Sequence, residues 1–127
     1  MINRDVKILV IDPMATVTRL VASQLRSFGF NSIDQLHNAS EAQGYVERGH
    51  YDLVLSEWDL GQVSGLELLK SVRANPLTKS LPFLLMTAEI EVDRVIEARQ
   101  AGVSGYLVKP FSDNLLNQRI TSVLARG

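Results

Sequence analysis

Residues 52–65 read DLVLSEWDLGQVSG, and this stretch predicts how the chain folds. A short apolar run ends abruptly in the carboxylate of Glu57, and the turn after it leads into LELLKSVR, which has helical spacing of apolar residues. Similar apolar runs alternate with longer helical stretches along the whole chain. The runs are KILVI (7–11), SIDQL (32–36), DLVLS (52–56), PFLLM (82–86) and GYLV (105–108). The sequence therefore predicts five strands that alternate with five helices.

The helices are marked by apolar spacing and by residues that typically begin or end a helix. Ser40, with Gln43 three residues later, forms a capping-box pattern for a second helix that closes near Gly49. The apolar markers of the other helices are Val17, Leu20, Val21, Leu25 and Phe28; Leu68, Leu69 and Val72; Val92, Val95 and Ile96; and Leu116, Ile120, Val123 and Leu124. Gly29, Asn75-Pro76 and Gly102 end the first, third and fourth helices, and Ser112 and Asp113 cap the last.

This alternation with short connections predicts an α/β fold with a parallel sheet covered by helices on both faces. The run at 32–36 carries Asp34 and Gln35, so we expect it at an edge of the sheet. In open sheets of this kind, ligands collect beyond the carboxyl ends of the strands. The residues at those ends are Asp12 and Pro13, Glu57, Thr87 and Ala88, and Lys109 and Pro110. We expect two carboxylates, a hydroxyl and an ammonium to converge there.

Composition limits the classes of function. The chain has 127 residues, which fits one domain spanning 1–127, and its 13 basic and 14 acidic residues give no field that favours nucleic acid or a membrane surface. It has no cysteine and no segment long and apolar enough to cross a membrane. We therefore expect a soluble cytoplasmic protein that neither binds nucleic acid directly nor inserts into a membrane.

Four motifs in this order resemble the receiver domains of two-component response regulators, the CheY-like family. The motifs are ILVIDP, DLVLSE followed by Gly65 and LELLKSVR, LLMTA, and GYLVKPF. The resemblance covers essentially the whole chain and implies a flavodoxin-like, doubly wound sheet with strand order 2-1-3-4-5. It also implies signalling by phosphorelay rather than classical enzyme activity. In that family an Asp after the third strand accepts a phosphoryl group, and acidic residues after the first strand help hold Mg²⁺.

Carried over residue by residue, the family pattern fits this chain only in part. Thr87 and Lys109 match the hydroxyl and ammonium that contact the phosphoryl group, Tyr106 matches the switch aromatic, and Lys109-Pro110 matches a step that is usually cis. Glu57 stands at the phosphoacceptor position, Pro13 at that of a second acidic ligand, and Gly61 where proline is common. The metal set implied by the resemblance is Asp12, Glu57 and Asp59, and Mg²⁺ binding there is doubtful because Pro13 removes one ligand.

The longer side chain of Glu57 misaligns in-line phosphoryl transfer, and a misplacement of about 1 Å can cost on the order of 10²-fold in rate. Its permanent charge of about −1 imitates only part of a phosphoryl group's roughly −1.5 to −2. We therefore predict a phosphorylation-independent pseudo-receiver in which Glu57 is a partial phospho-mimic. The alternative is a working receiver that still phosphorylates itself with Mg²⁺, for which Asp59 is a candidate acceptor. A flavodoxin-type cofactor binder is disfavoured because DPMAT is no phosphate cradle.

Structural interpretations stand beside these roles. Asp12 before Pro13 is also typical of a helix N-cap, and Glu57 with Lys109 of a structural ion pair that also fixes the signalling state. Thr87 is also typical of a strand-end hydroxyl bonded to backbone, and Tyr106 of a packed ring whose hydroxyl reaches solvent.

The resemblance also indicates how the chain meets its partners. The family's usual partner surface is the face of the fourth helix, fifth strand and fifth helix, where a histidine kinase or a downstream target binds. In this chain the charged residues on the fourth helix are more typical of a solvated face. They are Glu89, Glu91, Asp93, Arg94, Glu97 and Arg99. His37 and His50 are isolated and are expected at the surface.

Overall fold

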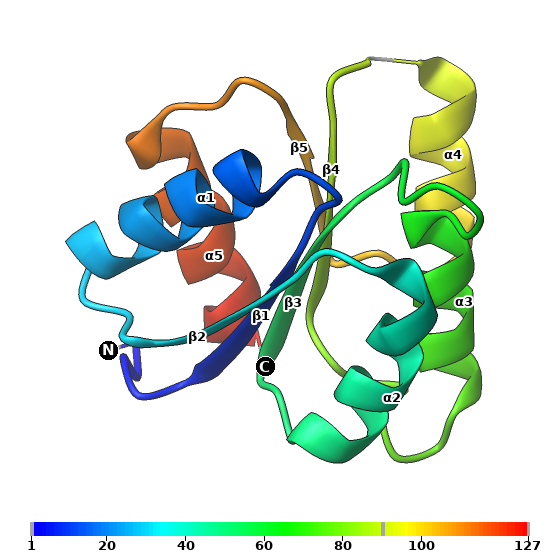
Figure 1. The fold of residues 1–127 in the computed structure, drawn as a ribbon, viewed down its shortest axis with the longest axis horizontal. Coiled ribbons are helices and arrows are strands. Elements are labelled where there is room, and N and C mark those ends of the chain that lie inside the picture. The colour runs from blue at the N-terminus through cyan, green and yellow to red at the C-terminus, as the bar shows by residue number, and fades with distance from the viewer. Residues whose placement is uncertain (1, 90, 127) are drawn as a thin grey trace.

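The computed structural model describes residues 2–89 and 91–126, and in them five strands alternate with five helices (Figure 1). The strands are β1 (Lys7–Ile11), β2 (Ser32–Leu36), β3 (Leu53–Glu57), β4 (Phe83–Thr87) and β5 (Gly105–Val108). The helices are α1 (Ala15–Ser27), α2 (Ala39–Gly49), α3 (Gly65–Ala74), α4 (Val92–Gln100) and α5 (Asp113–Arg126). All strand pairs are parallel and the order is β2-β1-β3-β4-β5, as predicted, with β2 at an edge.

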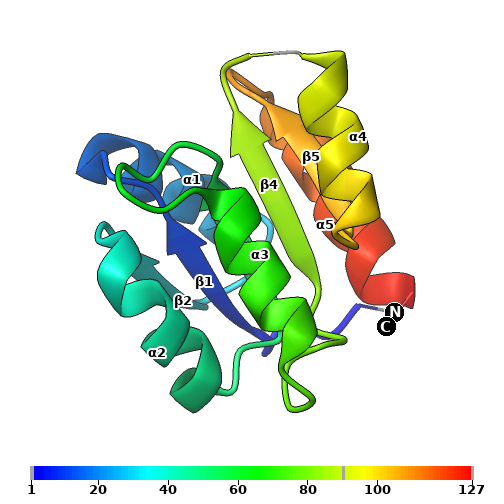
Figure 2. The ribbon, with the colours of Figure 1, turned by 90° about the vertical axis from the view of Figure 1, so that its right-hand side faces the viewer.

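Helices cover both faces of the sheet, α1 and α5 on one and α2, α3 and α4 on the other (Figures 1 and 2). Successive residues of β1 point to opposite faces, so Ile8 packs in the core beside α1 and α5 while Leu9 packs in the core beside α2 and α3. The central strands are therefore apolar at almost every position, because both of their faces are buried.

Two strands lie one residue later than the sequence predicted. Glu57 and Thr87 are the last residues of β3 and β4 rather than the first residues after them. The pairing in the sheet causes the shift, since Trp58 N–H donates to the Met86 carbonyl at 2.8 Å and Lys109 N–H to the Thr87 carbonyl at 2.7 Å. Both candidate side chains therefore stand on strand backbone.

Two expected helix caps are wrong. Asn38, not Ser40, caps α2, because the Asn38 side chain accepts a hydrogen bond from the Ser40 N–H at 2.9 Å. Gln43 instead donates to Glu47 at 2.8 Å on the next turn. At α1 the N-cap is Met14, so Asp12 does not cap that helix. The predicted cap of α5 is confirmed, since the Ser112 hydroxyl accepts from the Leu115 N–H at 3.1 Å.

The apolar residues that mark α4 do not form its buried face. Val92 is 72% exposed and Ile96 47% exposed, and Ala98 is the buried residue of this helix. A helix that rests on a single small residue lies less deeply in the core than α3, which buries Leu66, Leu68, Leu69 and Val72. The exposed apolar pair of α4 is therefore available at the surface.

Candidate functional site

The candidate site lies at the carboxyl ends of four adjacent strands. Asp12 follows β1, Glu57 ends β3, Thr87 ends β4 and Lys109 follows β5. These side chains come from distant parts of the chain but meet at one edge of the sheet, because parallel strands place all their carboxyl ends on the same side. The predicted convergence of carboxylates, hydroxyl and ammonium at this edge is confirmed for the two carboxylates and the ammonium.

Lys109 bridges the two carboxylates. Its Nζ donates to Asp12 Oδ2 and to Glu57 Oε1, each at 2.6 Å. The side chains of Asp12 and Glu57 are 2% and 11% exposed, and that of Lys109 is 19% exposed. The predicted ion pair between Glu57 and Lys109 is therefore present, and Asp12 shares the same ammonium.

The remaining oxygens of both carboxylates accept backbone hydrogen bonds. Asp12 Oδ1 accepts from the Met14 N–H and Glu57 Oε2 from the Asp59 N–H, both at 2.9 Å. All four carboxylate oxygens thus have a donor within the chain. Asp12 tethers the turn before α1 in this way, although it does not cap the helix.

The two carboxylates set the protonation of Lys109. Burial by itself lowers the pKa of the ammonium, but the hydrogen bonds and negative charges of Asp12 and Glu57 outweigh burial and raise the pKa above the usual 10.5. Lys109 is therefore cationic at neutral pH, and the cluster of two anions and one cation carries a formal charge of −1.

The three residues of the expected metal set do not lie together. Asp59 stands in the loop after β3, its side chain is 66% exposed, and its carboxylate contacts Arg94 at 3.3 Å. In the described ranges, no three His, Cys, Asp or Glu side chains form a group that could hold a metal ion. The structure therefore brings Asp12 and Glu57 to Lys109, and Asp59 to α4.

Thr87 has partners of two kinds. Its Oγ1 accepts from the backbone N–H of Glu89 at 3.3 Å, as expected for a strand-end hydroxyl, and from Arg94 Nη1 at 3.3 Å. The side chain itself is fully buried.

The ring of Tyr106 packs edge-on against Trp58, with ring centroids 6.4 Å apart. The expectation that its hydroxyl reaches solvent is wrong, because the oxygen is buried and has no hydrogen-bond partner within residues 2–89 and 91–126. Burial raises the pKa of the Tyr106 phenol, although the nearby charge of Arg94 lowers it in part. The phenol is therefore neutral at physiological pH.

Two residues near the site were missed by the sequence reasoning. Arg94 was assigned to a solvated helix face, but its guanidinium turns inward to Asp59 and Thr87 and lies 4.9 Å from the ring of Trp58. The acidic neighbours of Arg94 hid this role, because a mixed charge cluster has the pattern of a solvated helix. Trp58 is the sole tryptophan, and its position directly after Glu57 was the available signal.

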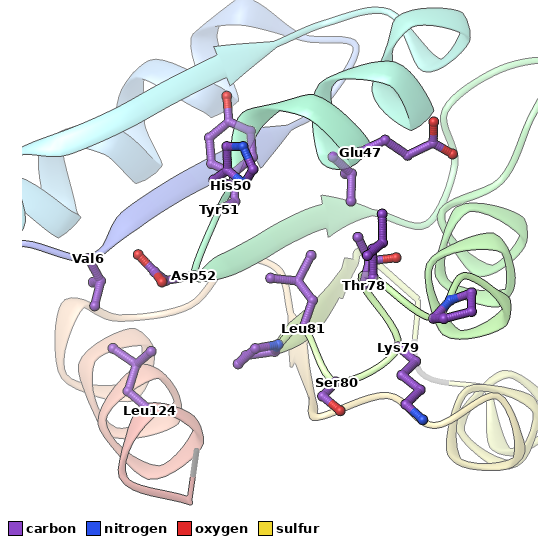
Figure 3. Close-up of a pocket in the computed structure, with 14 residues that line it drawn as sticks. Val6, Glu47, His50, Tyr51, Asp52, Thr78, Lys79, Ser80, Leu81 and Leu124 are labelled. Carbon is purple, nitrogen blue, oxygen red and sulfur yellow. The ribbon is translucent and has the colours of Figure 1, made fainter.

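A cleft lies at the opposite end of the sheet (Figure 3). It encloses about 660 Å³ between the loops before β3 and β4, with Asp52, Leu81 and Leu124 among its lining residues. The sequence-predicted site residues do not line it. The candidate site at the carboxyl ends of the strands is therefore separate from this cleft.

The fold and this edge define a signalling domain, and residues 8–121 match the response regulator receiver domain family. The chain belongs to that family. The helices of the described part are too short or too polar to span a membrane.

The chain is similar to two chemotaxis proteins of known sequence. It is 37% identical over 125 residues to chemotaxis protein CheY-3 of Vibrio cholerae, covering 98% of this chain and 96% of that protein. It is also 37% identical over 120 residues to chemotaxis protein CheY of Pseudomonas aeruginosa, covering 94% and 97%.

Solved structures show the same CheY-like fold. Chemotaxis protein CheY4 of Vibrio cholerae superposes with a TM-score of 0.87 at 26% identity over 94% of this chain and 99% of that chain. A two-component response regulator from Clostridium difficile superposes with a TM-score of 0.86 at 30% identity over 96% and 98%. The flavodoxin-like architecture expected from the motifs is therefore confirmed.

Proposed function

We propose that this receiver domain acts by protein contact without being phosphorylated, and that Glu57 holds it in one signalling state as a partial phospho-mimic. The observation that carries the proposal is the position of Glu57 itself. Its carboxylate stands at the strand end where the family has the acceptor Asp, and it already bonds Lys109 at 2.6 Å.

The Lys109 contact gives the proposal its physical content. In the family this lysine contacts the phosphoryl oxygens, and here its ammonium is shared between Glu57 and Asp12. A permanent carboxylate with a charge of about −1 supplies part of the attraction that a phosphoryl group of roughly −1.5 to −2 would exert. Glu57 is thus a permanent partner for Lys109, which in a phosphorylated receiver would contact the phosphoryl group.

The proposal assigns no role to Mg²⁺, although the family implies that ion. Mg²⁺ requires near-octahedral oxygen coordination, and Pro13 provides no side-chain oxygen at the second acidic position. The oxygens of Asp12 and Glu57 accept hydrogen bonds from Lys109, Met14 and the Asp59 backbone. These carboxylate oxygens are therefore arranged to bind an ammonium rather than a divalent cation.

The proposed output is binding to other signalling proteins, a histidine kinase or a downstream target, through the face of α4, β5 and α5. Support comes from the exposed apolar side chains of Val92 and Ile96, which are 72% and 47% exposed. With a formal charge of −1, the chain has no field for nucleic acid, and direct DNA contact is not part of the proposal. The cytoplasmic location inferred from the sequence stays a prediction.

The decisive experiment is intact-mass measurement after incubation with Mg²⁺ and a small-molecule phosphodonor. We expect no phosphoryl gain in the native chain. Glu57→Asp, measured alongside, tests whether the glutamate at the acceptor position is the only block to phosphorylation. Glu57→Asp combined with Pro13→Asp tests whether the acidic residue missing at position 13 is a second block. A phosphoryl gain in the native chain would overturn the proposal, and its loss in Asp59→Asn would then assign the modification to Asp59.

A further inference from the structure

Arg94 of α4 makes a bidentate contact with Asp59 in the loop that follows β3. Its Nη2 donates to Asp59 Oδ1 at 3.3 Å and its Nη1 to Asp59 Oδ2 at 3.4 Å. The planar guanidinium and the planar carboxylate therefore meet side by side, which fixes their relative direction as well as their distance. Glu91, the N-cap residue just before α4, has its Oε2 3.9 Å from Arg94 Nε.

The same guanidinium lies over the ring of Trp58, 4.9 Å from the ring centre. A cation over the face of an indole is attracted by the negative charge of the ring face. Trp58 is only 6% exposed, and its ring also packs edge-on against Tyr106. Arg94 is thus in contact with the buried Trp58, which packs against the half-buried Tyr106 of β5.

Arg94 also reaches the hydroxyl of Thr87. The Thr87 oxygen accepts from Arg94 Nη1 and from the Glu89 N–H, so both of its acceptor positions are in use. The buried Tyr106 hydroxyl is left without a partner in the part of the chain that the structure describes. Of the two side chains with which the family switches, Thr87 is therefore the one that bonds Arg94.

The rest of α4 is only weakly attached to the sheet. Ala98 is its buried residue, and the Glu91 side chain does not cap the first turn. Arg94, at the third position of α4, bonds the beginning of this helix to Asp59 and Thr87.

From these contacts we infer that Arg94 is a positioning residue, which fastens α4 to the β3–α3 loop and holds the α4 face in its partner-binding arrangement without phosphorylation. The inference rests on the proposed function for the meaning of that face, because Val92 and Ile96 are carried by the same helix. The contacts to Asp59, Trp58 and Thr87 hold α4 against this loop and against the end of β4.

The test compares Arg94→Met with the matched variant Arg99→Met in the unphosphorylated chain. Methionine keeps an apolar stem over Trp58 and removes only the guanidinium, while Arg99 is an exposed residue of the same helix with no side-chain hydrogen bond in residues 2–89 and 91–126. The readouts are amide hydrogen exchange of residues 92–100 and acrylamide quenching of the single tryptophan.

We expect Arg94→Met to speed exchange in α4 by about threefold or more, a modest factor because the Asp59 end of the contact is exposed to solvent. Trp58 should become more accessible to the quencher. Asp59→Asn should change both readouts in the same direction, and Arg94→Lys should recover part of each. Arg99→Met should leave both near the native values.

Equal behaviour of Arg94→Met and Arg99→Met, or native values in both Arg94→Met and Asp59→Asn, would overturn the inference. Failure of the proposed function would appear differently, as a phosphoryl gain in the native chain, and it leaves these two readouts unaffected because they are measured without a phosphodonor. The two ideas are therefore tested independently.

Discussion

Replacing Lys109 with methionine removes the only cation that bridges Asp12 and Glu57 in the described structure. Methionine is of similar length and apolar, so the change deletes the charge and keeps most of the volume. Two carboxylates whose side chains are 2% and 11% exposed then face each other without a counter-charge. We expect the folded state to lose stability because neither anion can recover its hydration.

The size of the loss follows from burial. Removing one partner of a buried ion pair costs about 3–5 kcal/mol, and the 19% exposure of the Lys109 side chain places this case near the lower end, about 3 kcal/mol. For a domain of this size, that corresponds to a fall in Tm of about 10 °C. Urea unfolding followed by circular dichroism and thermal unfolding measure the two quantities separately.

A double-mutant cycle with Glu57→Gln tests whether electrostatics causes the loss. Glu57→Gln alone should cost about 1 kcal/mol, because Lys109 keeps Asp12 as a partner. The double variant Lys109→Met with Glu57→Gln should be more stable than Lys109→Met by about 1 kcal/mol or more, since only one buried anion remains.

The sign of the pH dependence is also fixed. In Lys109→Met the folded state holds two carboxylates without a counter-charge, and acid relieves their repulsion, so the deficit shrinks as the pH falls from neutral toward 5. In the native chain the raised pKa of Lys109 acts at alkaline pH instead. Its contribution to stability is present at neutral pH and is lost only as the pH rises above 10.5 through the pKa of the folded state. A Lys109→Met deficit that is the same at pH 7 and pH 5, or a double variant no more stable than Lys109→Met, would refute this reasoning.

Three further predictions concern the same edge of the sheet. Tyr106→Phe removes a buried hydroxyl without a partner among the described residues, so we expect it to be neutral or to stabilise the chain by up to about 1 kcal/mol in urea unfolding. A clear loss of stability would instead show that the hydroxyl makes a hydrogen bond. Gly65→Ala places a Cβ in steric conflict with the Glu57 backbone carbonyl oxygen and should destabilise the fold by about 2 kcal/mol or more, seen as a lower Tm. An unchanged Tm would show that the backbone moves freely to make room. Millimolar Mg²⁺ should leave the fluorescence of Trp58 unchanged in the native chain and alter it in Pro13→Asp combined with Glu57→Asp. A saturable response of the native chain would contradict the conclusion that its carboxylates do not bind Mg²⁺.

The fold was predictable from short-range patterns. Each central strand is almost wholly apolar because both of its faces are buried, and each helix carries its apolar residues at helical spacing. Parallel strands joined by short connections leave few topologies open, so the order of the sheet and the edge position of β2 followed. The meeting of Asp12, Glu57 and Lys109 at one edge followed as well, because the carboxyl ends of parallel strands lie on the same side of the sheet.

The caps were less predictable because several polar residues stand near each helix start. Ser40 and Asn38 are both suitable N-cap residues. The helix begins at Ala39, so Asn38 is the cap and Ser40 lies inside the helix. Asp12 likewise fits a cap, but Lys109 from the other end of the chain takes one of its oxygens and the helix begins three residues later. Local pattern alone does not weigh such a distant partner.

Arg94 shows the same limit at the site. Its neighbours in sequence are acidic, which is typical of a solvated helix face, and nothing local indicates Asp59 or Thr87 as partners. The exposure of Val92 and Ile96 has a related cause, because the rotation of α4 about its axis is set by what it packs against.

The sequence by itself determined the alternation of strands and helices, the family, and which side chains stand at the strand ends, since these depend on spacing along the chain. Only the tertiary structure decided which of those side chains bond one another. Lys109 lies 97 residues from Asp12 and 52 from Glu57, yet its Nζ is 2.6 Å from both carboxylates. Such contacts depend on how strands from distant segments pack side by side, and charge interactions are strong only over a few ångströms.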